Sequence, residues 1–197
     1  MPCGIKPSLS RIIGGVEATP YSIPWQVSLG GCGGTLISAR HVVTARHCGI
    51  TTGRVAIVGE HDLRNSSDGR RHTICDVTNH PHYDISILHL QTPVQMGHRT
   101  VRACLPTLKH AGDFLAGKLM TVSGWGNTDY PQTHYPDKLR VVNVTGVTLA
   151  LCREKYEDIT ISYVTNGDMC AGDMIDGGED SCQGDSGGMI LNCENYD

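Results

Sequence analysis

The sequence predicts a mostly antiparallel β-protein, and two observations support this prediction. Short runs rich in β-branched residues recur between segments that contain Gly, Pro, Asn and Asp, which is typical of strands separated by turns. Residues 139–145 also alternate in part between polar and apolar side chains, as a half-buried strand does. A helical repeat is scarce, and residues 149–156 are its best candidate.

Strands are predicted wherever a β-branched run lies between turn residues. In chain order they cover residues 35–38, 41–45, 54–58, 85–90, 119–123 and 139–145. Because turn signals separate these short runs, they indicate a mostly antiparallel arrangement.

Composition limits the class of protein. The chain has 197 residues, 39% of them hydrophobic, which is enough for one or two compact domains with a buried core. Its formal charge is −4 and it has no dense Lys/Arg run, so we expect no nucleic-acid partner. No apolar run approaches the roughly 20 residues that cross a bilayer, so we expect no membrane span.

Cysteine usage indicates the compartment. Nine cysteines and 24 glycines are typical of a loop-rich, disulfide-bonded, secreted protein. The ten histidines raise the alternative of a metal site, but neither Cys-x-x-Cys nor His-Glu-x-x-His spacing occurs. We therefore expect no metal and no cofactor.

One motif carries most of the chemistry. Residues 180–188 place Ser186 between glycines and directly after an acid. A serine hydroxyl is a weak nucleophile unless a base takes its proton and N–H groups stabilise the resulting oxyanion. His47 follows a β-branched run, and Asp84 heads another apolar run. Taken singly, these residues also fit a packed core histidine, a strand-capping acid and a glycine-rich turn.

The order His47, Asp84, Ser186, with Arg-Ile-Ile-Gly-Gly at 11–15 and Ser-Gly-Trp-Gly at 123–126, resembles the chymotrypsin family of serine endopeptidases, in particular its trypsin-like members. The resemblance runs from Cys3 to about Cys193. It implies two antiparallel six-stranded β-barrels with the site in the cleft between them. The first would cover about 24–106 and the second about 117–197, with the connection at 107–116.

The same resemblance implies that the chain is a C-terminally truncated member, with the second barrel incomplete and the peptidase domain at 12–197. It assigns His47 as general base and then general acid, with Asp84 orienting it. Ser186 would be the nucleophile, and the backbone N–H groups of Gly184 and Ser186 would bind the oxyanion.

Two further roles follow from the resemblance. Asp180 matches the acid at the bottom of the primary specificity pocket, which implies cleavage after Arg or Lys; the alternative is a solvated acid in an acidic loop. Residues 1–11 resemble a propeptide. Cleavage after Arg11 would free the amine of Ile12 to pair with Asp185, so the chain would be a zymogen; the alternative is a surface arginine before a glycine turn.

The family pattern also implies the disulfides. It joins Cys32 to Cys48, Cys152 to Cys170, and Cys3 to Cys104, and it leaves Cys75, Cys182 and Cys193 without an assigned partner.

Several positions depart from the family. Arg46 replaces the usual alanine beside His47, and the segment that leads into Asp84 is shorter than usual. Glu60 begins a loop like the family's calcium loop, but Arg70 stands where an acidic ligand is expected, so we predict no calcium there.

The leading hypothesis is a secreted trypsin-like endopeptidase with polypeptide substrates, protein inhibitors and an activating protease as partners. The alternative is a non-catalytic or truncated homologue that acts as a protein-binding module. A zinc hydrolase is a third and weaker hypothesis, because the histidines form no ligand cluster.

Overall fold

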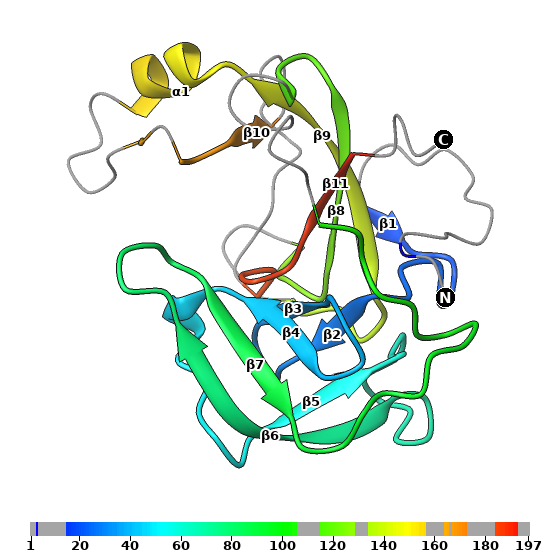
Figure 1. Ribbon diagram of the computed structural model, residues 1–197. Coiled ribbons are helices and arrows are strands. Elements are labelled where there is room, and N and C mark those ends of the chain that lie inside the picture. The colour runs from blue at the N-terminus through cyan, green and yellow to red at the C-terminus, as the bar shows by residue number, and fades with distance from the viewer. Residues whose placement is uncertain are drawn as a thin grey trace.

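The computed structural model describes residues 3, 15–105, 115–128, 134–156, 164–165, 167–172 and 184–192. Within these residues the chain forms a closed antiparallel barrel and a second, open antiparallel sheet, which lie one above the other in Figure 1. The predicted β class is therefore confirmed. The predicted connection at 107–116 lies largely outside the described residues, and the domain boundaries stay predictions.

The barrel is closed in the order β2-β3-β4-β7-β6-β5. Its strands are β2 (Gln26–Ser28), β3 (Gly33–Leu36), β4 (His41–Thr44), β5 (Val55–Val58), β6 (Arg70–Asn79) and β7 (Ser86–Leu90). In β4, β5 and β7 every second residue is buried, because successive side chains of a strand point to opposite faces. One face of each strand thus fills the barrel.

The second sheet has the order β1-β9-β8-β11, with β10 also paired to β9. Its strands are β1 (Val16–Glu17), β8 (Leu119–Gly124), β9 (Arg140–Val147), β10 (Cys170–Gly172) and β11 (Ile190–Asn192). The α-helix α1 (Leu149–Tyr156) follows β9 directly, at the segment where the sequence predicted it.

The main hydrophobic core lies inside the barrel and extends to the second sheet. Trp25, Val27 and Leu88 are at most 2% exposed within it, and Trp125 and Val141 from the second sheet belong to the same cluster. Burial of each large apolar side chain stabilises the fold by about 1.5–3 kcal/mol. The shared cluster therefore fixes the second sheet against the barrel, at the boundary where the candidate site lies.

The described residues form three disulfides: Cys3–Cys104, Cys32–Cys48 and Cys152–Cys170. These are the pairs that the family pattern implies. Cys75 is a free, exposed thiol, and Cys182 and Cys193 lie outside the described residues. None of the helices in the described part of the chain is long and apolar enough to cross a membrane.

Candidate active site

His47 lies on a single helical turn that directly follows β4. The 3-10 helix η1 (Arg46–Cys48) begins after the extended Ala45 and ends at Gly49, whose φ is +60°. A left-handed residue at this position is the usual end of a helix and suits glycine. Cys48 within the turn is bonded to Cys32, just before β3. The turn that carries His47 is therefore held both by the strand and by a disulfide.

Asp84 binds His47 through both carboxylate oxygens. Its Oδ2 atom lies 2.6 Å from the ring Nδ1, and Oδ1 accepts the backbone N–H of His47 at 2.7 Å. An ionised acceptor at Nδ1 fixes the tautomer with the proton on that nitrogen, which leaves Nε2 able to accept a proton. Burial raises the pKa of Asp84, but the hydrogen bonds from the ring and from the backbone of His47 and Arg46 outweigh it, so the net pKa is lowered.

The His47–Asp84 pair is open to solvent. The two side chains are 58% and 57% exposed. The segment before Asp84 is a tight turn in which His80 N–H binds the Ile85 carbonyl at 2.9 Å, and Tyr83 beside it is 58% exposed. Water at the pair weakens its electrostatic attraction, so the shortened segment noted in the sequence leaves this pair less shielded than a buried one.

Arg46 has a role that the sequence did not indicate. Its guanidinium donates to the backbone carbonyls of His80 and Pro81, at 3.1 and 3.4 Å. The positive charge is thus used to hold the turn that leads into Asp84. A long side chain with several N–H donors is the only signal of this role in the sequence, and it does not reveal which carbonyls are bound.

Ser186 belongs to a segment that docks on the barrel. Its carbonyl accepts the N–H of Gly33 in β3 at 2.8 Å and lies 3.6 Å from the sulfur of Cys48. Gly187, with φ +77°, packs so closely that a Cβ atom there would overlap Thr44 and the Gly33 carbonyl. The backbone of Ser186 therefore lies beside the Cys32–Cys48 disulfide, and Cys48 is the residue next to His47.

Asp185 is held by the Ser-Gly-Trp-Gly motif. Its Oδ1 atom accepts the backbone N–H of Gly126 at 2.7 Å. A Cβ atom at either Gly124 or Gly126 would overlap its carboxylate, so both glycines are needed for this close approach. The turn after Asp185 is closed by Gly188, whose N–H binds the Asp185 carbonyl at 2.9 Å. The motif at 123–126 thus positions the segment that contains Ser186.

Three predicted residues, Arg11, Ile12 and Asp180, lie outside the described residues. The ion pair between Ile12 and Asp185 and the acidic specificity pocket therefore stay predictions. Gly184 is described and has φ +105°, a left-handed conformation that favours glycine. Its role with Ser186 as an oxyanion donor also stays a prediction.

In the loop after β5, the carboxylate of Asp68 accepts hydrogen bonds from within the protein. Asp68 accepts the Tyr21 hydroxyl and the N–H groups of His61 and Asp62. Within the described ranges, no group of three or more His, Cys, Asp and Glu residues is arranged to hold a metal ion. Both Asp68 oxygens thus accept hydrogen bonds within the protein, and the absence of calcium from this loop stays a prediction.

Comparisons with known proteins place this geometry in a family. The family model described as Trypsin matches residues 12–196. The chain is 33% identical to the clotting factor G beta subunit of Tachypleus tridentatus, over 96% of this chain and 68% of that protein. It is 36% identical to Trypsin-3 of Homo sapiens, over 92% of this chain and 60% of that protein.

Other relatives agree with these. Serine protease 1 of Canis lupus familiaris is 34% identical, over 92% of this chain and 74% of its own length. Among solved structures, neuropsin, a serine protease expressed in the limbic system of mouse brain, superposes with a TM-score of 0.81 at 30% identity. That match covers 92% of this chain and 83% of the neuropsin chain.

Proposed function

Because this chain belongs to the trypsin family of serine endopeptidases, we propose that it is the catalytic part of a secreted enzyme that hydrolyses polypeptides after Arg or Lys. The resemblance read from the motifs is thereby confirmed at the level of the family. The single observation that supports activity most is the His47–Asp84 pair, with Nδ1 and Oδ2 2.6 Å apart, beside the docked Ser186 segment.

In the proposed reaction His47 takes the proton of the Ser186 hydroxyl through Nε2, since Asp84 occupies Nδ1. The serine oxygen attacks the substrate carbonyl, and the N–H groups of Gly184 and Ser186 stabilise the oxyanion. His47 then gives the proton to the leaving amine, and an acyl-enzyme remains on Ser186. A water molecule, deprotonated by His47, attacks the ester, and the serine takes the proton back.

The preference for Arg or Lys rests on Asp180. In the family pattern this acid lies at the bottom of the pocket for the side chain before the scissile bond, and a carboxylate pairs there with a guanidinium or ammonium group. Replacement of Asp180 by Ser is expected to abolish the preference for Arg and Lys in peptide libraries. An unchanged preference would exclude this assignment.

Activation by cleavage after Arg11 is supported by contacts near both ends of the proposed ion pair. Arg140, in β9, donates to the carbonyl of Gly15 and pairs across the sheet with Gly124, and Gly124 contacts the Asp185 carboxylate. Three peptide units separate Gly15 from Ile12, a reach of about 10 Å for an extended chain. The proposal requires the new amine of Ile12 to reach Asp185 within this length.

Secretion is supported by the three disulfides, since such bonds persist in oxidising compartments. A second candidate function, a non-catalytic homologue that binds proteins, is favoured by the exposure of His47 and Asp84, at 58% and 57%. Water weakens the electrostatic attraction between an exposed histidine and its aspartate, so an exposed pair activates a serine less than a shielded pair does. The two candidates differ in whether Ser186 reacts.

The test is covalent labelling of the full chain. The chain is cleaved after Arg11 and exposed to a fluorophosphonate, and the intact mass is measured. We expect one label per chain, with none for Ser186→Ala and much slower labelling of the uncleaved chain. A folded, cleaved chain that does not label would favour the protein-binding alternative.

A further inference from the structure

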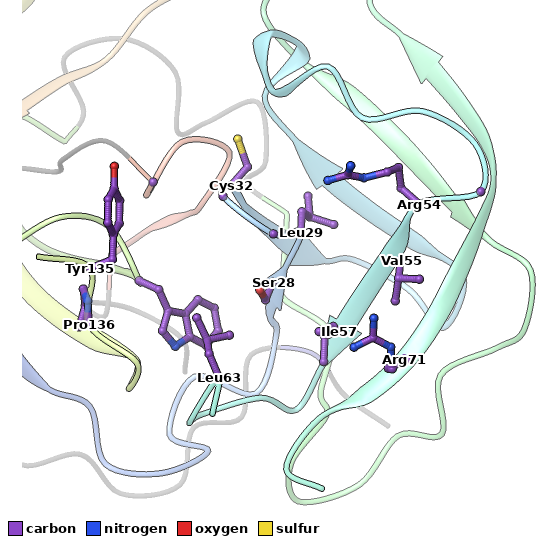
Figure 2. A pocket seen from close by; sticks show the side chains of 15 residues that line it. Ser28, Leu29, Cys32, Arg54, Val55, Ile57, Leu63, Arg71, Tyr135 and Pro136 are labelled. Atoms are coloured by element: carbon purple, nitrogen blue, oxygen red, sulfur yellow. The ribbon is translucent and has the colours of Figure 1, made fainter. Parts of the chain in front are cut away.

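A pocket of about 630 Å³ opens beside Gly184, between the barrel and the second sheet. Figure 2 shows it with Tyr135 on one side and the strand with Val55 and Ile57 on the other. Most of its lining is apolar, with Leu29 and Leu63 among the contributing residues. Because Gly184 belongs to the proposed oxyanion hole, the scissile carbonyl of a substrate at Ser186 would lie beside this pocket.

The pocket is open because the chain around it is short. Residues 29–32 join β2 to β3 in a hairpin turn in which Leu29 N–H binds the Cys32 carbonyl at 3.0 Å. The two central residues, Gly30 and Gly31, have φ values of +73° and +105°, as tight hairpin turns require. Glycines carry no side chain that could cover the apolar floor.

Two arginines line this pocket, and neither has an acidic partner among the residues that the structure describes. Arg54, just before β5, and Arg71, in β6, both line it and both are exposed. Figure 2 shows the Arg54 guanidinium directed towards the Leu29 hairpin, while Arg71 lies beside Ile57. Neither guanidinium makes an ion pair with any residue that the structure describes, whereas Arg64 and Arg99 pair with carboxylates.

The described part of the lining carries charge of one sign only. The described lining residues include these two arginines and no Asp or Glu. A cleft whose charged groups share one sign attracts the opposite sign, and its low-dielectric wall strengthens the field. The pocket is therefore complementary to a segment that combines apolar and acidic side chains.

The position of His47 tells which half of a substrate reaches the pocket. In the proposed reaction His47 gives its proton to the leaving amine, so the leaving half must lie next to His47. Cys48 follows His47 directly, and its disulfide partner Cys32 lines the pocket. The chain that follows the scissile bond thus runs past this disulfide into the pocket, at about 3.3 Å per residue.

We propose that Arg54 and Arg71 make the enzyme prefer polypeptides with an acidic side chain in the second or third position after the scissile bond. This inference rests on the proposed function. The apolar floor between the two arginines accepts a neighbouring apolar side chain, and the arginines bind the carboxylate. Because both arginines are exposed, the preference weakens as the salt concentration rises.

The test compares two peptides that are identical except that they carry Glu or Gln at the second and third positions after the scissile bond. Lys is not used at these positions, because the proposed specificity would create a second cleavage site after it. For the activated enzyme we expect kcat/KM to be higher for Glu than for Gln by about threefold for each arginine, the strength of an exposed ion pair. The double variant Arg54→Glu with Arg71→Glu is expected to reverse this order. Equal rates of the wild type on the two peptides would overturn the proposal.

A matched control separates the pocket from net charge. Arg70→Glu changes the charge next to Arg71, but consecutive residues of a strand point to opposite faces, and Arg70 does not line the pocket. It is expected to keep most of the preference for Glu. A short amide substrate with a small leaving group should react equally with the wild type and the double variant. Loss of the preference in Arg70→Glu would contradict the assignment.

A binding measurement keeps this inference distinct from the proposed function. The Ser186→Ala chain is titrated with the leaving half of each peptide alone, by calorimetry at low salt. Tighter binding of the Glu peptide than of the Gln peptide, lost in Arg54→Ala with Arg71→Ala, supports the pocket assignment even if the wild type fails to react with the fluorophosphonate. Equal binding of the two peptides would overturn it whether or not the enzyme is active.

Discussion

Glu60 and Asp68 lie against one another in the loop after β5, both buried, and their pKa values are shifted in opposite directions. Burial raises the pKa of Asp68, but hydrogen bonds from Tyr21 and from the backbone of Asp62 and His61 lower it by more, so the net pKa is lowered. Burial and the negative charge of Asp68 raise the pKa of Glu60. The charged form is therefore favoured at Asp68 and disfavoured at Glu60.

Replacement of Asp68 by Asn is expected to destabilise the fold by about 1–3 kcal/mol at pH 7, because charged hydrogen bonds in a buried site are lost. Since the pKa of Asp68 is lowered in the folded state, its contribution is present above the unfolded value of about 3.9 and is lost as the pH falls through the folded value. Urea unfolding at several pH values measures this.

The difference in unfolding free energy between the wild type and Asp68→Asn should therefore become smaller only below about pH 4. Asp76→Asn, at an exposed position of β6, is the control and should change the unfolding free energy little at any pH. A difference that stays constant down to the lowest accessible pH would contradict the role given to the Asp68 charge.

Replacement of Glu60 by Gln should have the opposite pH dependence. A carboxyl group whose pKa is raised in the folded state makes the fold less stable as the pH rises from its unfolded value of about 4.3 through the folded value. Gln carries no charge, so the variant is expected to be at least as stable as the wild type at pH 7. Thermal unfolding at pH 7 measures this. A decrease in unfolding temperature as large as that of Asp68→Asn would disprove the prediction.

Arg46 is expected to act on catalysis through Asp84. Its bonds to the His80 and Pro81 carbonyls hold the turn that carries the acid, so Arg46→Ala should lower kcat by roughly tenfold, as small misplacements of catalytic groups do, with little change in KM. Arg40→Ala is the matched control, since Arg40 also donates to two carbonyls, of Leu90 and Gln91, away from His47.

The two variants should unfold at similar temperatures, because each loses two hydrogen bonds from a guanidinium to backbone carbonyls. Equal kcat values for Arg46→Ala and Arg40→Ala would show that the turn before Asp84 does not need the guanidinium.

The sequence predicted strands best where the side chains of the strand themselves alternate between the core and the surface. Residues of β4 and β7 alternate cleanly, and both strands were found. In β6, by contrast, only His72 and Ile74 are buried, and its outward face is polar, so no apolar pattern marks it. The short strands β10 and β11 form only because β9 and β8 provide partners.

The site divides in the same way. Side-chain chemistry and motif order suggested His47, Asp84 and Ser186 as a set. The bond from Gly33 to the Ser186 carbonyl could not be predicted, because it joins the backbone of β3 to the backbone of a turn that precedes β11, and backbone groups are the same in every sequence. The bond from the Gly126 N–H to the Asp185 carboxylate also has a backbone group as one partner, so the sequence shows the acid but not the donor that it binds.

The cradle of Asp185 leads to the last prediction. Gly126→Ala would place a methyl group where the Asp185 carboxylate lies, so either the carboxylate moves or the backbone at 184–188 shifts. Overpacking of this kind typically costs about 1–3 kcal/mol, and a displaced Asp185 would no longer orient Gly184 and Ser186. We expect fluorophosphonate labelling of the activated chain to slow by at least about tenfold, which corresponds to ~1.4 kcal/mol in the barrier.

Gly97→Ala is the control for this change, because nothing lies within 4 Å of a Cβ atom at that position. It should label at the wild-type rate. If Gly126→Ala also labels at the wild-type rate while it unfolds at a lower temperature, then the cradle contributes to stability alone, and the segment that carries Ser186 keeps its reactive conformation without a fixed Asp185.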